Sequence, residues 1–258
     1  EAVEKIDNLT NDYEYNIGSL NFTRYNNNLI SGKIYSSNFS KDTILNENNN
    51  SANSLIYLIN YLLLFNRMSV FTNIIEYLFS KITNHKNLKI DEIKQNYYSM
   101  NFLGDKYLPL YNHFFKDGFI EYQVIFDKSK YQKAIQEMVI LIKNGNYSSY
   151  MSSFKAYKPA NPKYLFGLTK NGYCITLDIP FQKNNNFSDF IRKLNEIAIK
   201  YDGQVYLGKT PCLNNEEFKT MYKNYGQFKT LKKIYDPELI IRSEMTNRLF
   251  SDFYNHKY

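Results

Sequence analysis

A lysine near the end of the chain is the side chain that its sequence context places best for chemistry. Residues 204–207 predict a short strand, which begins after a turn at Asp202-Gly203. Lys209 follows this strand, directly after Gly208. A lysine held at a strand end can meet an anionic or oxygen-rich group. The alternative is an ordinary solvated lysine, since lysines are mostly exposed.

Two other strands are expected to carry polar side chains on one face. Residues 118–126 and 174–180 alternate with a period of two, so that each strand has an apolar face and a more polar one. A half-polar face indicates either exposure to solvent or a binding site. The polar faces hold Glu121 and Gln123 on the first strand, and Cys174, Thr176 and Asp178 on the second.

Three helices are expected around these strands. Residues 131–143 and 187–201 have apolar side chains at helical spacing. A third helix runs over 215–234 and ends at Asp236-Pro237, because proline cannot continue a helix. From residue 119 onward the order is strand, helix, strand, strand, helix, strand. This order predicts an α+β fold, an antiparallel sheet flanked by helices.

Composition excludes several classes of function. The 258 residues carry a net charge of +7, but the lysines are spread along the chain and form no cluster interleaved with stacking aromatics. We therefore expect no nucleic-acid partner. The three histidines lie far apart, and Cys174 and Cys212 form no CxxC pattern. The sequence thus predicts no metal site and no disulfide framework, and it is compatible with a reducing, cytoplasmic compartment.

The most apolar run of the chain is residues 55–65, which contains Asn60 and lies within an apolar segment of helical spacing, residues 55–77. The run is about half as long as the roughly twenty residues that a membrane span needs. The longer segment is interrupted at Asn66-Arg67. It predicts either a core helix or an element that lies on a membrane surface. The chain starts with polar residues and has neither a signal peptide nor an initiator methionine, so we expect a processed or excised piece of a longer protein.

A series of short motifs resembles the C-terminal part of a known enzyme family. The motifs are Gly118-Phe-Ile-Glu-Tyr-Gln123, Phe154-Lys155, Tyr206-Leu-Gly-Lys209, Phe218-Lys-Thr-Met-Tyr222, Asp236-Pro237 and Ser243-Glu-Met-Thr-Asn-Arg248-Leu249. They are similar, in the same order, to motifs of FAD-linked oxidases of the vanillyl-alcohol-oxidase type, in particular the decaprenylphosphoryl-ribose 2-oxidase group. The Gly-Lys and Asp-Pro elements also occur in sugar-lactone oxidases.

The resemblance implies roles for individual residues. Lys209 would act as the base for the hydroxyl proton or as a cation beside the flavin pyrimidine, and Tyr206 would contact the flavin edge. Gln123 and Lys155 would bind oxygens of a sugar or its phosphate. The remaining candidate substrate-binding residues are Glu121, Cys174 and Thr176.

Three of these positions depart from the family pattern. Glu121 stands where the family has glutamine, which adds a negative charge. Thr176 stands where some members have a cysteine that nitroaromatic inhibitors attack, and Cys174 takes the place of an asparagine. We therefore expect no covalent trapping at Thr176, and we expect Cys174 to be a packed residue rather than a nucleophile.

Family members bind FAD mainly through an N-terminal half with a glycine-rich diphosphate loop. This chain has ten glycines and no such cluster. We therefore expect residues 1–203 to form the substrate-binding (cap) domain and residues 204–258 to form the last segment of the FAD-binding domain, with the N-terminal FAD half absent. Such a piece is expected to be inactive alone and to retain no FAD.

The resemblance thus implies part of an FAD-dependent oxidoreductase that oxidises a secondary hydroxyl of a sugar, such as a polyprenylphosphoryl-ribose used in cell-wall biosynthesis. The expected partners are that substrate, a membrane surface contacted through 55–77, and an NAD-dependent reductase. One alternative is a sugar-1,4-lactone oxidase, whose tail usually has histidine where this chain has Tyr206. The other is a non-catalytic α+β binding module.

Overall fold

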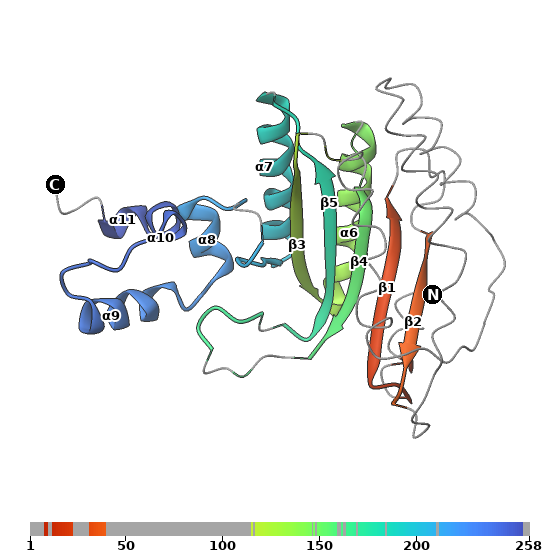
Figure 1. Ribbon diagram of the computed structural model, residues 1–258, viewed down its shortest axis with the longest axis horizontal. Helices are drawn as coiled ribbons and strands as arrows, with labels where there is room; N and C mark the ends of the chain where they lie inside the picture. Colours follow the sequence, from red (N-terminus) through yellow and green to blue (C-terminus); the bar gives the residue numbers. More distant parts are fainter. Residues whose placement is uncertain are drawn as a thin grey trace, which may run out of the picture.

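A six-stranded antiparallel sheet forms the centre of the described part of the chain (Figure 1). The computed structural model describes residues 8–9, 12–22, 31–39, 115, 117–145, 147, 149–158, 161, 164–168, 170–183, 185–209 and 212–254. The strands are β1 (Tyr15–Phe22), β2 (Ser31–Ser37), β3 (Phe119–Asp127), β4 (Ser149–Tyr157), β5 (Gly172–Pro180) and β6 (Gln204–Val205). They lie in the order β2-β1-β4-β5-β3-β6.

Two long helices cover one face of this sheet. Helix α6 (Lys128–Asn144) and helix α7 (Asn185–Lys200) contact each other behind β3, β4 and β5 (Figure 1). From β3 to β6 the chain follows the predicted order of strands and helices, which confirms the α+β fold class.

The apolar faces of the strands and helices meet in the core. Tyr122 and Leu177 of the sheet are fully buried, as are Met138 of α6 and Leu194 of α7. Burying one such large side chain stabilises a fold by about 1.5–3 kcal/mol. This packing holds the central strands rigidly, so that side chains on their other face have fixed positions.

That other face carries the polar side chains. In the register of β3 with β5, Glu121 lies opposite Asp178 and Gln123 lies opposite Thr176. In the register of β5 with β4, Cys174 lies opposite Lys155. Residues directly opposite on antiparallel strands have Cβ atoms about 5 Å apart. The predicted polar residues of two separate strands are therefore neighbours on one sheet face.

Four short helices follow the sheet and lie beyond its β3 side (Figure 1). They are α8 (Asn215–Met221), α9 (Tyr225–Tyr235), α10 (Glu244–Leu249) and α11 (Ser251–Tyr254). We call residues 212–254 the C-terminal helical unit. Asn214 and Glu217 form a capping box that begins α8, and Ser243 and Thr246 form another that begins α10.

The single helix predicted over 215–234 is wrong, because α8 and α9 are separate. Tyr222 leaves the helical conformation, with φ −116° and ψ 89°. Its hydroxyl donates a hydrogen bond to the carbonyl of Val205, 2.6 Å away in β6. A tertiary contact therefore interrupts a sequence with helical spacing. The predicted end of the helix is confirmed, since α9 stops at Tyr235, before Asp236-Pro237.

The apolar stretch 55–77 lies outside the described residues, and its predicted contact with a membrane stays a prediction. In the part of the chain that the structure describes, no helix has the length and apolar character needed to cross a bilayer.

Candidate functional site

A pocket of about 410 Å³ opens on the polar side of the sheet. The residues that line it come from β3, from β4 and the segment after it, and from the turn that follows β6. They are Gln123, Lys155, Tyr157, Lys158, Leu168, Tyr206 and Lys209. Pockets of this size with a few convergent polar groups commonly hold small ligands.

Gln123 is the best-fixed polar group of the pocket. Its side chain is only 5% exposed. The amide Nε2 donates a hydrogen bond to the Cys174 sulfur at 3.3 Å, and the same side chain hydrogen-bonds Tyr157. Its backbone carbonyl accepts a hydrogen bond of 2.8 Å from the backbone N–H of Tyr206. A side chain held by two protein partners is pre-organised to present its remaining polar capacity to a ligand.

Cys174 lies beneath this glutamine and does not line the pocket. It is 1% exposed, and burial raises the pKa of its thiol to about 11, although the Gln123 hydrogen bond and the charge of Lys155 act in the opposite direction. The thiol is therefore uncharged near pH 7, and an uncharged buried thiol is a poor nucleophile. This environment fits a packed cysteine.

Tyr157 adds a phenol hydroxyl to the pocket. Burial raises the pKa of its phenol, and the nearby Cys174 and Tyr206 raise it further, against the effect of the Gln123 hydrogen bond. The phenol is therefore protonated at neutral pH and can donate a hydrogen bond to a ligand oxygen.

Lys209 forms an ion pair with Glu121 at the edge of the pocket. Its Nζ lies 2.9 Å from Glu121 Oε1, and the two side chains are 37% and 27% exposed. Two glycines shape the segment that carries this lysine. Gly208 leaves room for the Tyr206 ring, since a Cβ there would lie 2.8 Å from ring atoms. Gly203 similarly lets the turn before β6 approach the core.

The C-terminal helical unit holds the segment that carries Lys209. Besides the bond from Tyr222 to β6, side chains of α7 and α10 fix the carbonyls of Cys212 and Leu213. Arg192 and Asn195 donate to the Cys212 carbonyl, and Arg248 donates to that of Leu213. The chain is therefore anchored just before and just after the turn that presents Lys209.

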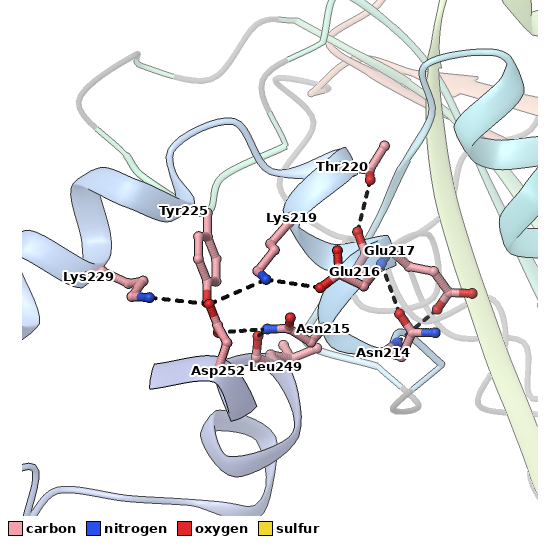
Figure 2. Close-up of polar contacts among 10 residues, drawn as sticks. All are labelled: Asn214, Asn215, Glu216, Glu217, Lys219, Thr220, Tyr225, Lys229, Leu249 and Asp252. Atoms are coloured by element: carbon pink, nitrogen blue, oxygen red, sulfur yellow. Dashed lines mark hydrogen bonds and ion pairs between the residues drawn. The ribbon is translucent and has the colours of Figure 1, made fainter. Parts of the chain in front are cut away.

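Asp252 in turn ties the short helices together (Figure 2). Its carboxylate accepts hydrogen bonds from Asn215 of α8 and from Tyr225 and Lys229 of α9, and it pairs with Lys219 of α8 at 3.3 Å. Partial burial raises the pKa of Asp252, but these hydrogen bonds outweigh it and lower the pKa to about 2. The carboxylate is therefore charged under all ordinary conditions.

Four of the predicted site residues, Gln123, Lys155, Tyr206 and Lys209, line one pocket. Of the other three, Glu121 contacts Lys209, Cys174 contacts Gln123, and Thr176 is buried opposite Gln123.

The sequence reasoning missed three pocket residues, Tyr157, Lys158 and Leu168. Tyr157 could have been found, because it lies two residues after Lys155 and so on the same strand face. Lys158 and Leu168 lie between β4 and β5, where no periodicity identifies them.

Two comparisons with known proteins bear on this pocket. The family model of D-arabinono-1,4-lactone oxidase matches residues 174–249, which run from β5 to the end of α10. Decaprenylphosphoryl-β-D-ribose oxidase of Mycolicibacterium smegmatis is 23% identical over 162 residues. The chain resembles the C-terminal portion of FAD-linked oxidases. The match covers 62% of this chain and 33% of the mycobacterial oxidase, so the chain spans about a third of that relative.

The described residues fit the site of the flavin ring in an FAD-linked oxidase but not the site of its diphosphate. Lys209 and Tyr206, at the open edge of the pocket, offer a cation and an aromatic ring of the kind that can contact a flavin ring system. A diphosphate needs a cradle of backbone N–H groups, and the sequence has no glycine-rich turn for one. An FAD-linked oxidase that uses these residues needs its diphosphate site elsewhere.

Proposed function

We propose that this chain is the substrate-binding portion of an FAD-dependent oxidoreductase that oxidises a secondary hydroxyl of a sugar, with a polyprenylphosphoryl-ribose or a similar compound as substrate. One observation carries the proposal. Gln123 and Lys155, proposed to bind substrate, and Tyr206 and Lys209, proposed to contact flavin, come from three separate segments and line a single pocket. The similarity to the mycobacterial oxidase supports the same substrate class.

The proposed reaction needs few groups from this chain. FAD, when bound, supplies the acceptor for the hydride of the carbon that bears the hydroxyl. Gln123, Tyr157 and Lys155 orient the sugar, because their amide, hydroxyl and ammonium groups can bind its oxygens. Lys209 either accepts the hydroxyl proton or provides positive charge next to the reacting oxygen. Its ion pair with Glu121 keeps the amine at the edge of the pocket.

A second observation supports the division of the chain into a cap, residues 1–203, and a segment of the FAD-binding domain, residues 204–258. Four large apolar side chains in a short stretch of the C-terminal helical unit are 64–81% exposed. Exposed apolar side chains gathered in one region commonly mark a surface that another protein surface covers. We propose that the flavin-binding portion covers them. They are Ile234, Tyr235, Ile240 and Ile241.

The match to the lactone-oxidase family model favours a second candidate, a sugar-1,4-lactone oxidase. Both candidates share the lysine at position 209. They differ at position 206, where the tyrosine favours the ribose-oxidase type. The third candidate, a binding module without catalysis, predicts no flavin in any form of the protein. An NAD-dependent reductase as a partner remains part of the proposal.

The test is flavin absorbance near ~450 nm in the complete gene product that contains these residues. We expect bound flavin that the sugar substrate bleaches. Lys209→Ala should leave flavin bound and remove the bleaching. Lys193→Ala, on the exposed side of α7, should change neither and is the matched control. A complete gene product that holds no flavin, even after reconstitution with FAD, would rule out the oxidase and leave the binding module.

A further inference from the structure

The three lysines of the pocket differ in their electrostatic surroundings. Lys209 is paired with Glu121 at 2.9 Å. Neither Lys155 nor Lys158 has a carboxylate within ion-pair distance among the residues that the structure describes. One end of the pocket, at Lys209, is therefore close to neutral. The other end, at Lys155 and Lys158, carries two positive charges that no described carboxylate pairs with.

Glu121 cannot be moved away from Lys209 without disturbing the sheet. It lies on β3, two residues before the buried Gln123, and β3 pairs with β5 along its whole length. Asp178 lies directly opposite Glu121 on β5. Two carboxyl side chains are therefore neighbours here, and Lys209 contacts the one on β3. The negative charge beside Lys209 is thus built into the central strands.

We propose that Glu121 determines which way round a ligand binds. A ligand with one anionic group places this group at Lys155 and Lys158, where positive charge is available. Its uncharged hydroxyls then lie at Gln123 and Lys209, because Glu121 repels a second anion there and can accept hydrogen bonds from hydroxyls. The chemical class that fits this arrangement is a sugar with a single phosphate group. The choice of a sugar rests on the proposed function, whereas the division of charge does not.

The charge at position 121 then governs specificity. A glutamine at position 121 would leave the charge of Lys209 uncompensated, and the pocket would then attract anions at both ends. With glutamate, an anion at Lys209 meets a carboxylate within about 5 Å. Between the dielectric constant of bulk water, about 80, and the value of about 20 near a protein surface, this repulsion corresponds to a loss of affinity of roughly fourfold to more than a hundredfold.

The experiment measures binding of three probes to the chain by isothermal titration calorimetry, without flavin. The probes are ribose, ribose 5-phosphate and ribose 1,5-bisphosphate. We expect the monophosphate to bind more tightly than ribose, and the bisphosphate to gain nothing over the monophosphate. Lys158→Gln should weaken monophosphate binding about tenfold and leave ribose unchanged, because a hydrogen bond to a charged group is lost. Lys193→Gln on α7 removes the same charge away from the pocket and should have no effect.

Glu121→Gln is the decisive variant. It should raise the affinity ratio of bisphosphate to monophosphate by roughly fourfold or more, whereas Glu196→Gln on α7 should not change this ratio. An unchanged ratio in Glu121→Gln would overturn the inference, as would a monophosphate that binds no better than ribose. Equal weakening by Lys158→Gln and Lys193→Gln would also overturn it, since it would show only general attraction to a basic protein. Flavin bleaching plays no part in these measurements, so their failure is distinct from a failure of the proposed oxidase activity.

Discussion

Replacing Asp252 with asparagine tests how the C-terminal helical unit is held together. The pKa of this carboxyl falls from its ordinary value of 3.8 to about 2, a difference that corresponds to about 2.5 kcal/mol of stabilisation. The side chain is 32% exposed, so solvent screening reduces this figure to about 1–1.5 kcal/mol. We expect Asp252→Asn to lower the free energy of unfolding by this amount at pH 7.

The pH dependence has a definite sign. A carboxyl whose pKa is lowered by folding stabilises the protein above its ordinary pKa, and this contribution is lost as the pH falls toward the lowered value. The difference between wild type and Asp252→Asn should therefore be constant from pH 7 to about 5, fall to about half near pH 3, and approach zero near pH 2. Urea unfolding followed by far-ultraviolet circular dichroism measures it, with the exposed Glu196→Gln as control. A difference that is the same at pH 3 and pH 7 would refute the assignment of this stabilisation to the charged carboxylate.

Three further predictions follow from single contacts. Tyr222→Phe removes the buried hydrogen bond to Val205 and should cost about 1–2 kcal/mol in urea unfolding, and an unchanged stability would contradict the role of this bond. Cys174 and Cys212 are buried, and burial raises the pKa of each thiol to about 11, so iodoacetamide at pH 8 should label them only in urea, as mass spectrometry would show. Gly172→Ala would place a Cβ 1.8 Å from a carbonyl oxygen of β3. It should lower the free energy of unfolding by about 3 kcal/mol or more. An unchanged free energy of unfolding would show that the two strands can move apart there at little cost.

Long periodic segments of the sequence predicted the elements well. Strand β3 alternates between apolar and polar side chains from Ile120 to Val124, and α6 repeats its apolar positions over several turns, so the period identifies the type of each element. The break between α8 and α9 could not be read in this way. It depends on the hydroxyl of Tyr222 reaching β6, a contact that exists only in the folded chain.

The candidate site, too, could be predicted from the sequence only in part. Alternation placed Glu121 and Gln123 on one face but left open whether that face is solvated. In the structure Gln123 is nearly fully buried, and its amide hydrogen-bonds Cys174 and Tyr157. Nothing in the spacing of Glu121 and Lys209 indicates an ion pair, since pairing depends on how β6 and its turn lie against β3.

The two ends of the pocket differ in how firmly the fold holds them. Gln123 and Lys155 stand on nine-residue strands that pair on both sides within the sheet. Lys209 follows a strand of only two residues, whose position depends on its pairing with β3 and on contacts from the C-terminal helical unit. Elements with few backbone hydrogen bonds open at lower free-energy cost than central strands. A change that loosens the helical unit, such as Asp252→Asn, should therefore displace the proposed catalytic lysine before it disturbs the groups proposed to bind the sugar. The precision of the proposed chemistry then depends on helices that do not themselves contact the substrate.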